Sequence, residues 1–399
     1  MGSGTLSLPL RPFARTGAAK VILIAILAPL VLIPAALAIR LGAYDSFVDN
    51  PLTGFGMWGT FAIHMWTRPS RREWMLTVAA ALAMRGLYDL AAGERGYPGY
   101  LLIGMGAFLG VASLLAIAVG ALGAASPRRA VCRRTLGVLA LLTYLGFCLG
   151  YYLSLAELIL PRKFDYYLYR FDGSLGFQPS FLAGRLLRRF PPLFLVEMTV
   201  YNCFGFWFSI VYAVHANSRA KYPVNVVKML VVNALAGFSL YFICPAMGPK
   251  YAFPSFPNLA PAIQAAPILM KGAPNAIPSL HFGGALLLCW FCRPWKWLFR
   301  LMSLFAALTA LATMGMGEHY LVDLVVAVPY ALAILAFSSQ VPERRLPLAA
   351  GAAMVLLWLF TLRLVHFYAP VAWTLALATV TVSFALERRL AAGVWKAIE

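Results

Sequence analysis

The sequence predicts an all-α protein, a polytopic bundle of about twelve transmembrane helices. Of its 399 residues, 62% are hydrophobic and only 12% are charged, and the mean hydropathy is +0.78. A soluble chain of this length needs far more polar surface. The apolar residues also form continuous blocks, and their lengths are close to what a helix needs to cross a bilayer, about 20 residues. Because these blocks are continuous and do not alternate, a transmembrane β-barrel is excluded.

Twelve apolar runs are the expected spans. They cover residues 20–39, 52–67, 74–92, 99–124, 136–159, 192–214, 228–245, 281–293, 299–317, 320–338, 347–364 and 367–386. We expect the first run to be a retained helix and not a cleaved signal peptide, because it fills a whole span. The eighth run is short, so it extends backwards or is tilted.

The positive charge of the chain orients these spans. The net charge is +19, from 33 Lys and Arg against 14 Asp and Glu. No basic stripe carries interleaved aromatic residues, so we do not expect nucleic-acid binding. The basic residues lie instead in short loops such as 67–73, 126–134 and 342–345, which predicts that these loops and both termini are cytoplasmic. We expect a bacterial inner-membrane protein.

One loop on the predicted outer side, residues 161–191, is also basic. The positive-inside rule constrains a loop of this length only weakly. Within it, "FLAGRLLRRF" (181–190) has an amphipathic spacing. This stretch is either a helix along the membrane surface or a solvated basic loop.

Two histidine motifs reach the same predicted face of the membrane. "IPSLHFGGALLL" (277–288) places His281 at the outer end of the eighth span, and "GEHYLVD" (317–323) places His319 at the outer end of the tenth. His319 and Asp323 are four residues apart on a predicted helix and therefore share a face. An Asp in this position can accept a hydrogen bond from one ring nitrogen and leave the other as a nucleophile or base. The alternative is a structural polar pair at a helix end.

Candidate substrate-binding residues lie on the same face. In "CPAMGPKYAFP" (244–254), Lys250 follows the seventh span directly and could clamp an anionic phosphate, although interfacial lysines are common. Tyr251 beside it is a further candidate. Ser279, with the backbone N–H groups that begin the eighth helix, could donate hydrogen bonds to phosphate oxygens.

Together these segments resemble the type 2 phosphatidic acid phosphatase (PAP2) superfamily, which shares its core with vanadium haloperoxidases. Pro278-Ser279-Leu280-His281 is similar to its second motif, PSGH, and the stretch from His319 to Asp323 is similar to its third. Three features are more similar to the branch that contains inositol-phosphorylceramide synthase and bacterial relatives. They are Leu280 in place of Gly, the sequence "HYLVD" and the stretch "DYYLYRFDGSLGFQP" (165–179). Two departures from the pattern imply that fewer cationic side chains bind the phosphate. Thr313 stands where the third motif usually has Arg, and no Arg-Pro follows Lys250.

The resemblance implies a six-helix catalytic core at residues 136–340, with accessory helices at 1–135 and further helices and a tail at 341–399. It implies a ping-pong reaction that uses no metal or other cofactor. His319 would form a phosphohistidine, Asp323 would orient it, and His281 would protonate the leaving oxygen and then activate the acceptor. The expected substrate is a phospholipid or other lipid phosphate at the periplasmic face. The acceptor would be water or a lipid or sugar hydroxyl.

Three other interpretations start from the same residues. A lipid transporter or flippase without chemistry would predict an internal repeat with broken helices in matching positions, and the sequence has no such self-similarity. A scaffold that had lost activity would not be expected to keep His281, His319 and Asp323. A metal-dependent hydrolase could use these same three residues as ligands.

The remaining polar and cysteine residues in the spans are expected to be mostly structural. Asp89 follows Arg85 by four residues, which predicts a self-satisfied pair. Cys289 and Cys292 of "CWFC" are expected to pack as small hydrophobic residues. Glu157 and Glu197 either form a hydrogen bond with a lipid headgroup or contact only neighbouring helices. No motif surrounds His64, His215 or His366.

Overall fold

The computed structural model describes residues 51–396, apart from 93–97, 124–125, 218–221 and 261–262, and residues Asp45–Glu399 cluster as one compact unit. The first predicted span, 20–39, lies outside the described residues. The helices of the N-terminal half are α2 (Pro51–Trp66), α3 (Arg71–Ala92), α4 (Pro98–Leu122), α5 (Pro127–Ile159), α6 (Asp165–Ser174), α7 (Pro179–Arg189), α8 (Pro191–Asn202) and α9 (Phe204–Asn217). They are followed by α10 (Val226–Ile243), α11 (Pro249–Ala252), α12 (Leu280–Phe291), α13 (Lys296–Gly315), α14 (Leu321–Ser338), the 3-10 turn η2 (Pro342–Arg344), α15 (Arg345–Leu364) and α16 (Ala369–Lys396).

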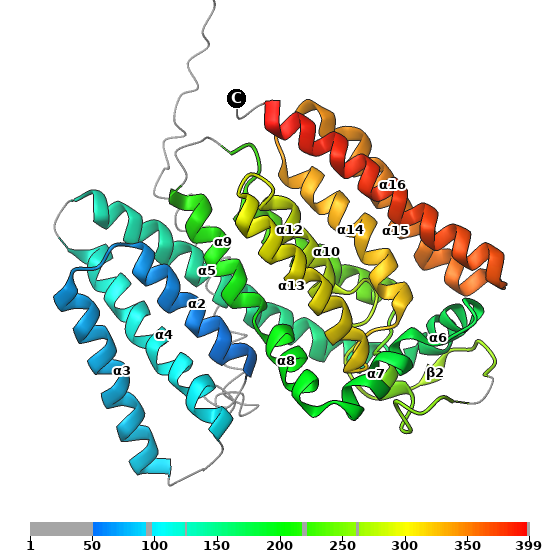
Figure 1. The fold of residues 1–399 in the computed structure, drawn as a ribbon, viewed down its shortest axis with the longest axis horizontal. Helices are drawn as coiled ribbons and strands as arrows, with labels where there is room; N and C mark the ends of the chain where they lie inside the picture. Colours follow the sequence, from blue (N-terminus) through cyan, green and yellow to red (C-terminus); the bar gives the residue numbers. More distant parts are fainter. Residues whose placement is uncertain (1–50, 93–97, 124–125, 218–221, 261–262, 397–399) are drawn as a thin grey trace, which may run out of the picture. The chain divides into compact units, whose positions relative to one another are not determined.

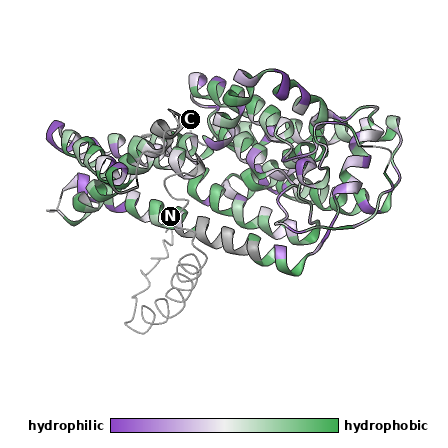
Figure 2. Ribbon diagram, turned by 90° about the horizontal axis from the view of Figure 1, so that it is seen from below, coloured by the Kyte–Doolittle hydropathy of each residue, from purple (hydrophilic) through white to green (hydrophobic). Residues whose placement is uncertain are grey.

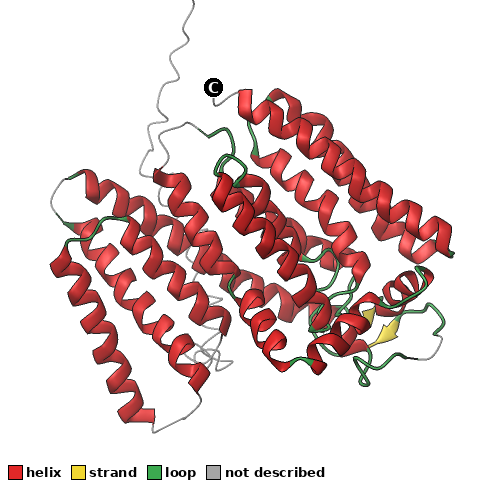
Figure 3. Ribbon diagram, in the orientation of Figure 1, coloured by secondary structure: helices red, strands yellow, loops and turns green. Residues whose placement is uncertain are grey.

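The all-α fold class is confirmed. Figure 3 shows helices throughout, with one short strand pair, β1 (Arg162–Lys163) and β2 (Ile268–Leu269). Hydrophobic residues predominate along the helices (Figure 2). Six of the described helices are long and apolar enough to cross a membrane, or seven if the bent pair α8 and α9 is one span. The total of twelve spans stays a prediction.

Each predicted span among the described residues contains a helix, and the main difference lies in the sixth. Residues 192–214 are divided between α8 and α9, which are bent by 50° at Cys203. The apolar run continues across the bend, so hydropathy alone does not reveal it. The amphipathic stretch 181–190 does form a helix, α7, whose buried residues include Phe181 and Leu187.

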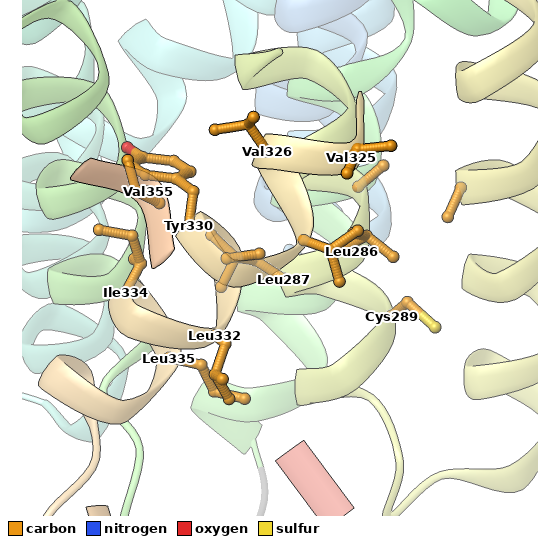
Figure 4. Packing of buried hydrophobic residues seen from close by; sticks show 14 of the residues in the cluster. Leu286, Leu287, Cys289, Val325, Val326, Tyr330, Leu332, Ile334, Leu335 and Val355 are labelled. Carbon is orange, nitrogen blue, oxygen red and sulfur yellow. The ribbon is translucent and has the colours of Figure 1, made fainter. Parts of the chain in front are cut away.

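Helix α14 lies at the centre of the C-terminal half (Figure 1). It packs against α10, α12, α15 and α16, and it is the most buried of the candidate spans. Figure 4 shows its side chains Val325 and Val326 near Leu286 and Leu287 of α12. A helix that is apolar all round lies either in a protein core or in a membrane, and here neighbouring helices cover most of α14. At Gly351 of α15, an added Cβ would lie 2.7 Å from the Pro329 carbonyl oxygen, so a glycine lets α15 approach α14 closely.

The N-terminal helices α2 to α5 pack on one another, and α2 also lies against α9 (Figure 1). Glu73 of α3 links three of them. Its carboxylate contacts Nε2 of His64 on α2 at 3.2 Å and forms an ion pair with Arg128 of α5. A neighbouring carboxylate thus provides a partner for one ring nitrogen of the buried His64, which favours a structural role for this residue.

Short connections hold the loops at the end of the bundle where α12 and α14 begin. Strand β1 pairs antiparallel with β2, with Arg162 opposite Leu269, and so joins the start of α6 to the loop before α12. The backbone N–H of Phe164 donates to the Pro245 carbonyl at 2.8 Å. These contacts bring "DYYLYRFD", the loop after α10 and both histidine motifs to one end of the fold.

Candidate functional site

His281 is the second residue of α12. Ser279 precedes the helix as its N-cap, and its Oγ accepts a hydrogen bond from the backbone N–H of Phe282 at 3.4 Å. The imidazole of His281 is half-buried and stacks on the ring of Tyr201 from α8, with ring centroids 4.0 Å apart and an interplanar angle of 21°. The stacking fixes the plane of the imidazole at the mouth of the helix.

His319 lies just before α14, in the segment that joins it to α13. The prediction of a helix that includes His319 is wrong by two residues, because α14 begins at Leu321. The side chain is only 2% exposed, and its Nδ1 lies 3.5 Å from Oδ2 of Asp323. The one-turn proximity is therefore as expected. The predicted hydrogen bond is not formed, because 3.5 Å exceeds the normal range and Oδ2 instead accepts from the backbone N–H of Tyr320 at 2.7 Å.

The two motifs are joined through the backbone. The N–H of Ser279 donates to the carbonyl oxygen of Asp323 at 3.2 Å, which ties the start of α12 to the start of α14. His281 and His319 are close enough to interact electrostatically. From the other side, the hydroxyl of Ser180 on α7 donates to the carbonyl of His319 at 2.8 Å. Two segments that are distant along the chain thus meet at one point.

Lys250 of α11 reaches this region, but a carboxylate already neutralises it. Its Nζ forms an ion pair with Glu318, the residue before His319, and its backbone N–H donates to the Gly317 carbonyl at 3.0 Å. Burial would lower the pKa of Lys250, but the hydrogen bond and the charge of Glu318 outweigh it and raise the pKa. Lys250 therefore stays positively charged, with Glu318 as its counter-ion.

The other two predicted substrate-binding residues differ in access. Ser279 is fully buried and its hydroxyl serves the helix cap. Tyr251 is 42% exposed, and its hydroxyl donates to the second carboxylate oxygen of Glu318 at 3.3 Å. Lys250, Tyr251 and Glu318 thus form one polar cluster beside His319, whereas Ser279 contributes through the backbone of α12.

Two buried carboxylates on α6 hold this arrangement, and the motif reading did not identify them. Asp165 accepts hydrogen bonds from the backbone N–H of Gly248 at 2.8 Å and from the hydroxyl of Tyr320 at 3.1 Å. Gly248 has φ +110°, and an added Cβ would meet the carbonyl of Glu318, so only glycine fits there. Burial raises the pKa of Asp165 to about 6, against the lowering effect of its hydrogen bonds.

Asp172, two turns further along α6, caps α14. Its carboxylate accepts from the backbone N–H groups of Leu321 at 2.7 Å and Val322 at 3.1 Å. These are among the first N–H groups of α14, which have no partner within the helix. Burial raises the pKa of Asp172 to about 8, because the low-dielectric surroundings disfavour its charge more than the two N–H groups favour it. The stretch "DYYLYRFD" therefore positions His319 through the residues that follow it, by way of the Tyr320 hydroxyl and the first backbone N–H groups of α14.

The electrostatic state of His319 follows from its surroundings. Burial lowers the pKa of this imidazole to about 4, with a partial opposing effect from the Glu318 carboxylate and the Ala276 backbone. At neutral pH the ring is therefore uncharged, as a nucleophilic nitrogen must be. Thr313, which stands in the place of the expected Arg, accepts through its carbonyl from the N–H groups of Glu318 and His319 at 3.0 and 3.1 Å.

Several other polar residues have structural partners. Arg85 and Asp89 form the expected pair, with Nε 2.7 Å from Oδ2. Cys289 and Cys292 are buried and unpaired, and His215 packs against the rings of Tyr222 and Phe291. In the described part of the chain, no group of three or more His, Cys, Asp or Glu side chains is placed to hold a metal ion. His281, His319 and Asp323 therefore do not converge as a ligand set.

Comparison with known proteins agrees with the two motifs. Residues 166–337 match the family model of the PAP2 superfamily, and the match encloses His281, His319 and Asp323. No curated protein and no solved structure matches the chain. The match supports the assignment of this part of the chain to the PAP2 superfamily, whose members are phosphatases and phosphotransferases.

Proposed function

We propose that this protein is a membrane-embedded lipid phosphotransferase or phosphatase that works through a phosphohistidine on His319. One observation carries the proposal. The two histidine motifs meet at one end of the bundle, within the part of the chain that matches the PAP2 superfamily. The buried, uncharged imidazole of His319 and the carboxylate behind it are what such a nucleophile requires.

In the first step, a ring nitrogen of His319 attacks phosphorus, and a P–N bond forms while the P–O bond to the leaving group breaks. The protonated form of His281 gives its proton to the departing oxygen and becomes the neutral base of the second step. Asp323 faces Nδ1 of His319, so the attacking atom is Nε2 and the positive charge that develops on the ring is next to a carboxylate. A shortening of the Nδ1 to Oδ2 distance by about 0.5 Å would convert the present contact into a hydrogen bond.

In the second step, His281 takes a proton from the acceptor hydroxyl, whose oxygen attacks phosphorus as the P–N bond breaks. Water as acceptor yields phosphate, and a lipid or sugar hydroxyl yields a new phosphodiester or monoester. Lys250 stabilises the charge on the phosphoryl oxygens in both steps, and Glu318 is its counter-ion while no substrate is bound. Tyr251 and the N–H groups at the start of α12 complete the set of donors.

Further features of the proposal come from the sequence. The resemblance of "DYYLYRFDGSLGFQP" to the inositol-phosphorylceramide synthase branch favours transfer of a headgroup over simple hydrolysis. The loop charges favour a site on the periplasmic face of a bacterial inner membrane. No metal or other cofactor takes part in the proposed steps.

The test uses the purified full chain and a panel of phospholipids, with and without hydroxyl acceptors. Release of phosphate indicates a phosphatase, and a new headgroup-bearing lipid indicates a transferase. With a donor labelled in the phosphate, brief reaction and denaturation should leave an acid-labile, alkali-stable label on the wild type. His319→Gln should carry no label, and His281→Gln should be labelled much more slowly, because His281 protonates the departing oxygen in the step that forms the P–N bond. The label should also form in the presence of EDTA. A label on His319→Gln would contradict the proposal.

A further inference from the structure

A polar cavity lies at the same end of the bundle as His319. Its volume is about 240 Å³, and it is lined by α6 on one side and by the turn between α15 and α16 on the other. Figure 1 shows α6 beside the ends of these two helices, and they are in contact. The guanidinium of Arg363, at the end of α15, donates to the carbonyl of Ile243 at the end of α10 at 3.4 Å.

The cavity is separate from the candidate active site. Asp165 and Asp172, which hold the site, are seven residues apart and lie on one face of α6. The cavity is lined by Tyr167, Arg170 and Phe171, which the helical period places on the opposite face. One short helix thus separates the two.

The charges that line the cavity are all basic. They belong to Arg170 and Arg363, with the imidazole of His366 beside them, and none of the lining residues is Asp or Glu. Arg170 has no hydrogen bond or ion pair with any residue in the part of the chain that the structure describes, and its side chain is only partly exposed. Its N–H groups are therefore available to an anionic ligand, which a guanidinium binds through charge-assisted hydrogen bonds.

Arg363 is held rigidly. Besides the bond to Ile243, its Nε donates to the Leu359 carbonyl at 3.1 Å, and the guanidinium lies 5.1 Å from the ring centroid of Phe164. These contacts use only backbone carbonyls and aromatic faces, so its positive charge is not neutralised by a carboxylate. The remaining N–H groups are fixed in direction, as in a preorganised anion site.

The rim of the cavity is apolar and exposed. Leu364 is 81% exposed and Val365 is 45% exposed, both where the candidate span that contains α15 ends. Tyr368, which is 62% exposed, does not line the cavity but follows in the turn before α16. In a bilayer this position is at headgroup depth, where aromatic and aliphatic side chains meet lipid. A basic pocket with such a rim is suited to an anionic group that carries hydrocarbon chains.

We propose that this cavity binds the phosphate group of an anionic phospholipid, with Arg170 and Arg363 as its ligands. Its volume is below the about 300–1,000 Å³ of pockets that enclose drug-sized molecules, so it has room for a headgroup phosphate while the acyl chains lie outside along α15 and α16. This binding goes beyond the proposed phosphoryl transfer and does not depend on it.

The experiment is a calorimetric titration of the purified full chain in a neutral detergent. The probes are dioctanoyl phosphatidylglycerol, dioctanoyl phosphatidylcholine and inorganic phosphate. Arg170→Gln removes the charge without breaking an internal contact, and Ala265→Trp fills the cavity and leaves both arginines in place. Arg185→Gln removes an exposed charge from α7, which does not line the cavity, and is the control.

We expect the wild type and Arg185→Gln to bind phosphatidylglycerol alike, and Arg170→Gln and Ala265→Trp to bind it about tenfold more weakly or worse. Inorganic phosphate that binds with the same dependence on Arg170 would support the site and identify free phosphate as its ligand. Equal binding of phosphatidylcholine by the wild type would overturn the proposal. So would anion binding that survives Arg170→Gln, or that is lost only in Lys250→Gln.

Discussion

Nδ1 of His319 and Oδ2 of Asp323 lie 3.5 Å apart in a site where both side chains are buried. The same oxygen accepts the N–H of Tyr320, so Asp323 both caps the start of α14 and faces the imidazole. Its other oxygen has no hydrogen-bond partner among the described residues. A buried carboxylate oxygen without a hydrogen-bond donor is costly. A protonated or phosphorylated His319 would supply that donor.

Asp323→Asn should lower turnover at least about 100-fold, because an amide cannot stabilise the cation that forms on His319. The Asn side-chain oxygen can still accept from Tyr320, so the helix start should persist. Turnover of a lipid phosphate, with thermal unfolding measured in parallel, checks this. Asp89→Asn, which removes the acid of the Arg85 pair, is the matched control. Near-normal turnover in Asp323→Asn would show that this carboxylate is only structural.

The low pKa of His319 predicts the acid limb of the pH profile. Since burial lowers this pKa to about 4, the imidazole should stay uncharged well below pH 6.5. Protonation of His319 should therefore not lower kcat/KM until the pH falls to about 4. Stability follows the same shift. The unfolded chain takes up a proton near pH 6.5 and the folded chain does not, so stability falls as the pH falls from 6.5 through about 4. His319→Gln should lose this part of the pH dependence of unfolding, which thermal unfolding between pH 4 and 8 would measure.

Asp172→Asn should destabilise the start of α14 by about 1–3 kcal/mol, because one of two N–H groups loses its acceptor. The pKa of Asp172 lies above its ordinary 3.8, at about 8, so the stability that it contributes is complete below pH 3.8 and is lost as the pH rises through about 8. The difference in unfolding temperature between wild type and Asp172→Asn should therefore shrink between pH 4 and 8. A difference that grows over this range would contradict the assignment.

The sequence could predict the helices because continuous apolar runs of about 20 residues have few other structures available. It could not predict the bend at Cys203, where the run continues unbroken. His281 and His319 could be found because titratable groups are rare in such runs. The orientation of α14 relative to α12 could not be predicted, because it depends on the backbone contact between Ser279 and Asp323.

The supporting carboxylates are a different case. Asp165 and Asp172 lie seven residues apart in a conspicuous stretch, but their partners are backbone N–H groups 82 to 150 residues away. No side-chain pattern encodes a contact of this kind. Tyr201 could not be distinguished from any other aromatic residue of an apolar helix. Glu318 was visible next to His319, but its pairing with Lys250 required the fold to bring the two segments together.

That pairing makes a prediction about substrate affinity. Lys250→Gln should raise KM for a lipid phosphate about tenfold or more, because a charge-assisted contact to the phosphoryl group is lost. Glu318→Gln should lower KM, because the substrate no longer competes with a carboxylate for Lys250. Steady-state kinetics of both variants checks this. Lys228→Gln is the control, since that exposed lysine donates to the Phe337 carbonyl in another part of the fold. A raised KM in Glu318→Gln would indicate that the carboxylate helps to bind substrate.

The stacked rings of Tyr201 and His281 give the last prediction. The flat face of Tyr201, 4.0 Å from the imidazole centroid, restricts rotation of His281, so that its ring stays aimed at the reacting oxygen. Tyr201→Phe keeps the ring and should keep turnover within about threefold of wild type, whereas Tyr201→Leu should lower kcat about tenfold or more with little change in KM. Tyr166→Leu, which removes an aromatic stack on Phe253 away from the histidines, is the control for general loss of packing. If Tyr201→Phe were as impaired as Tyr201→Leu, the hydroxyl and not the stacked ring would be the group that matters, and the positioning argument would fail.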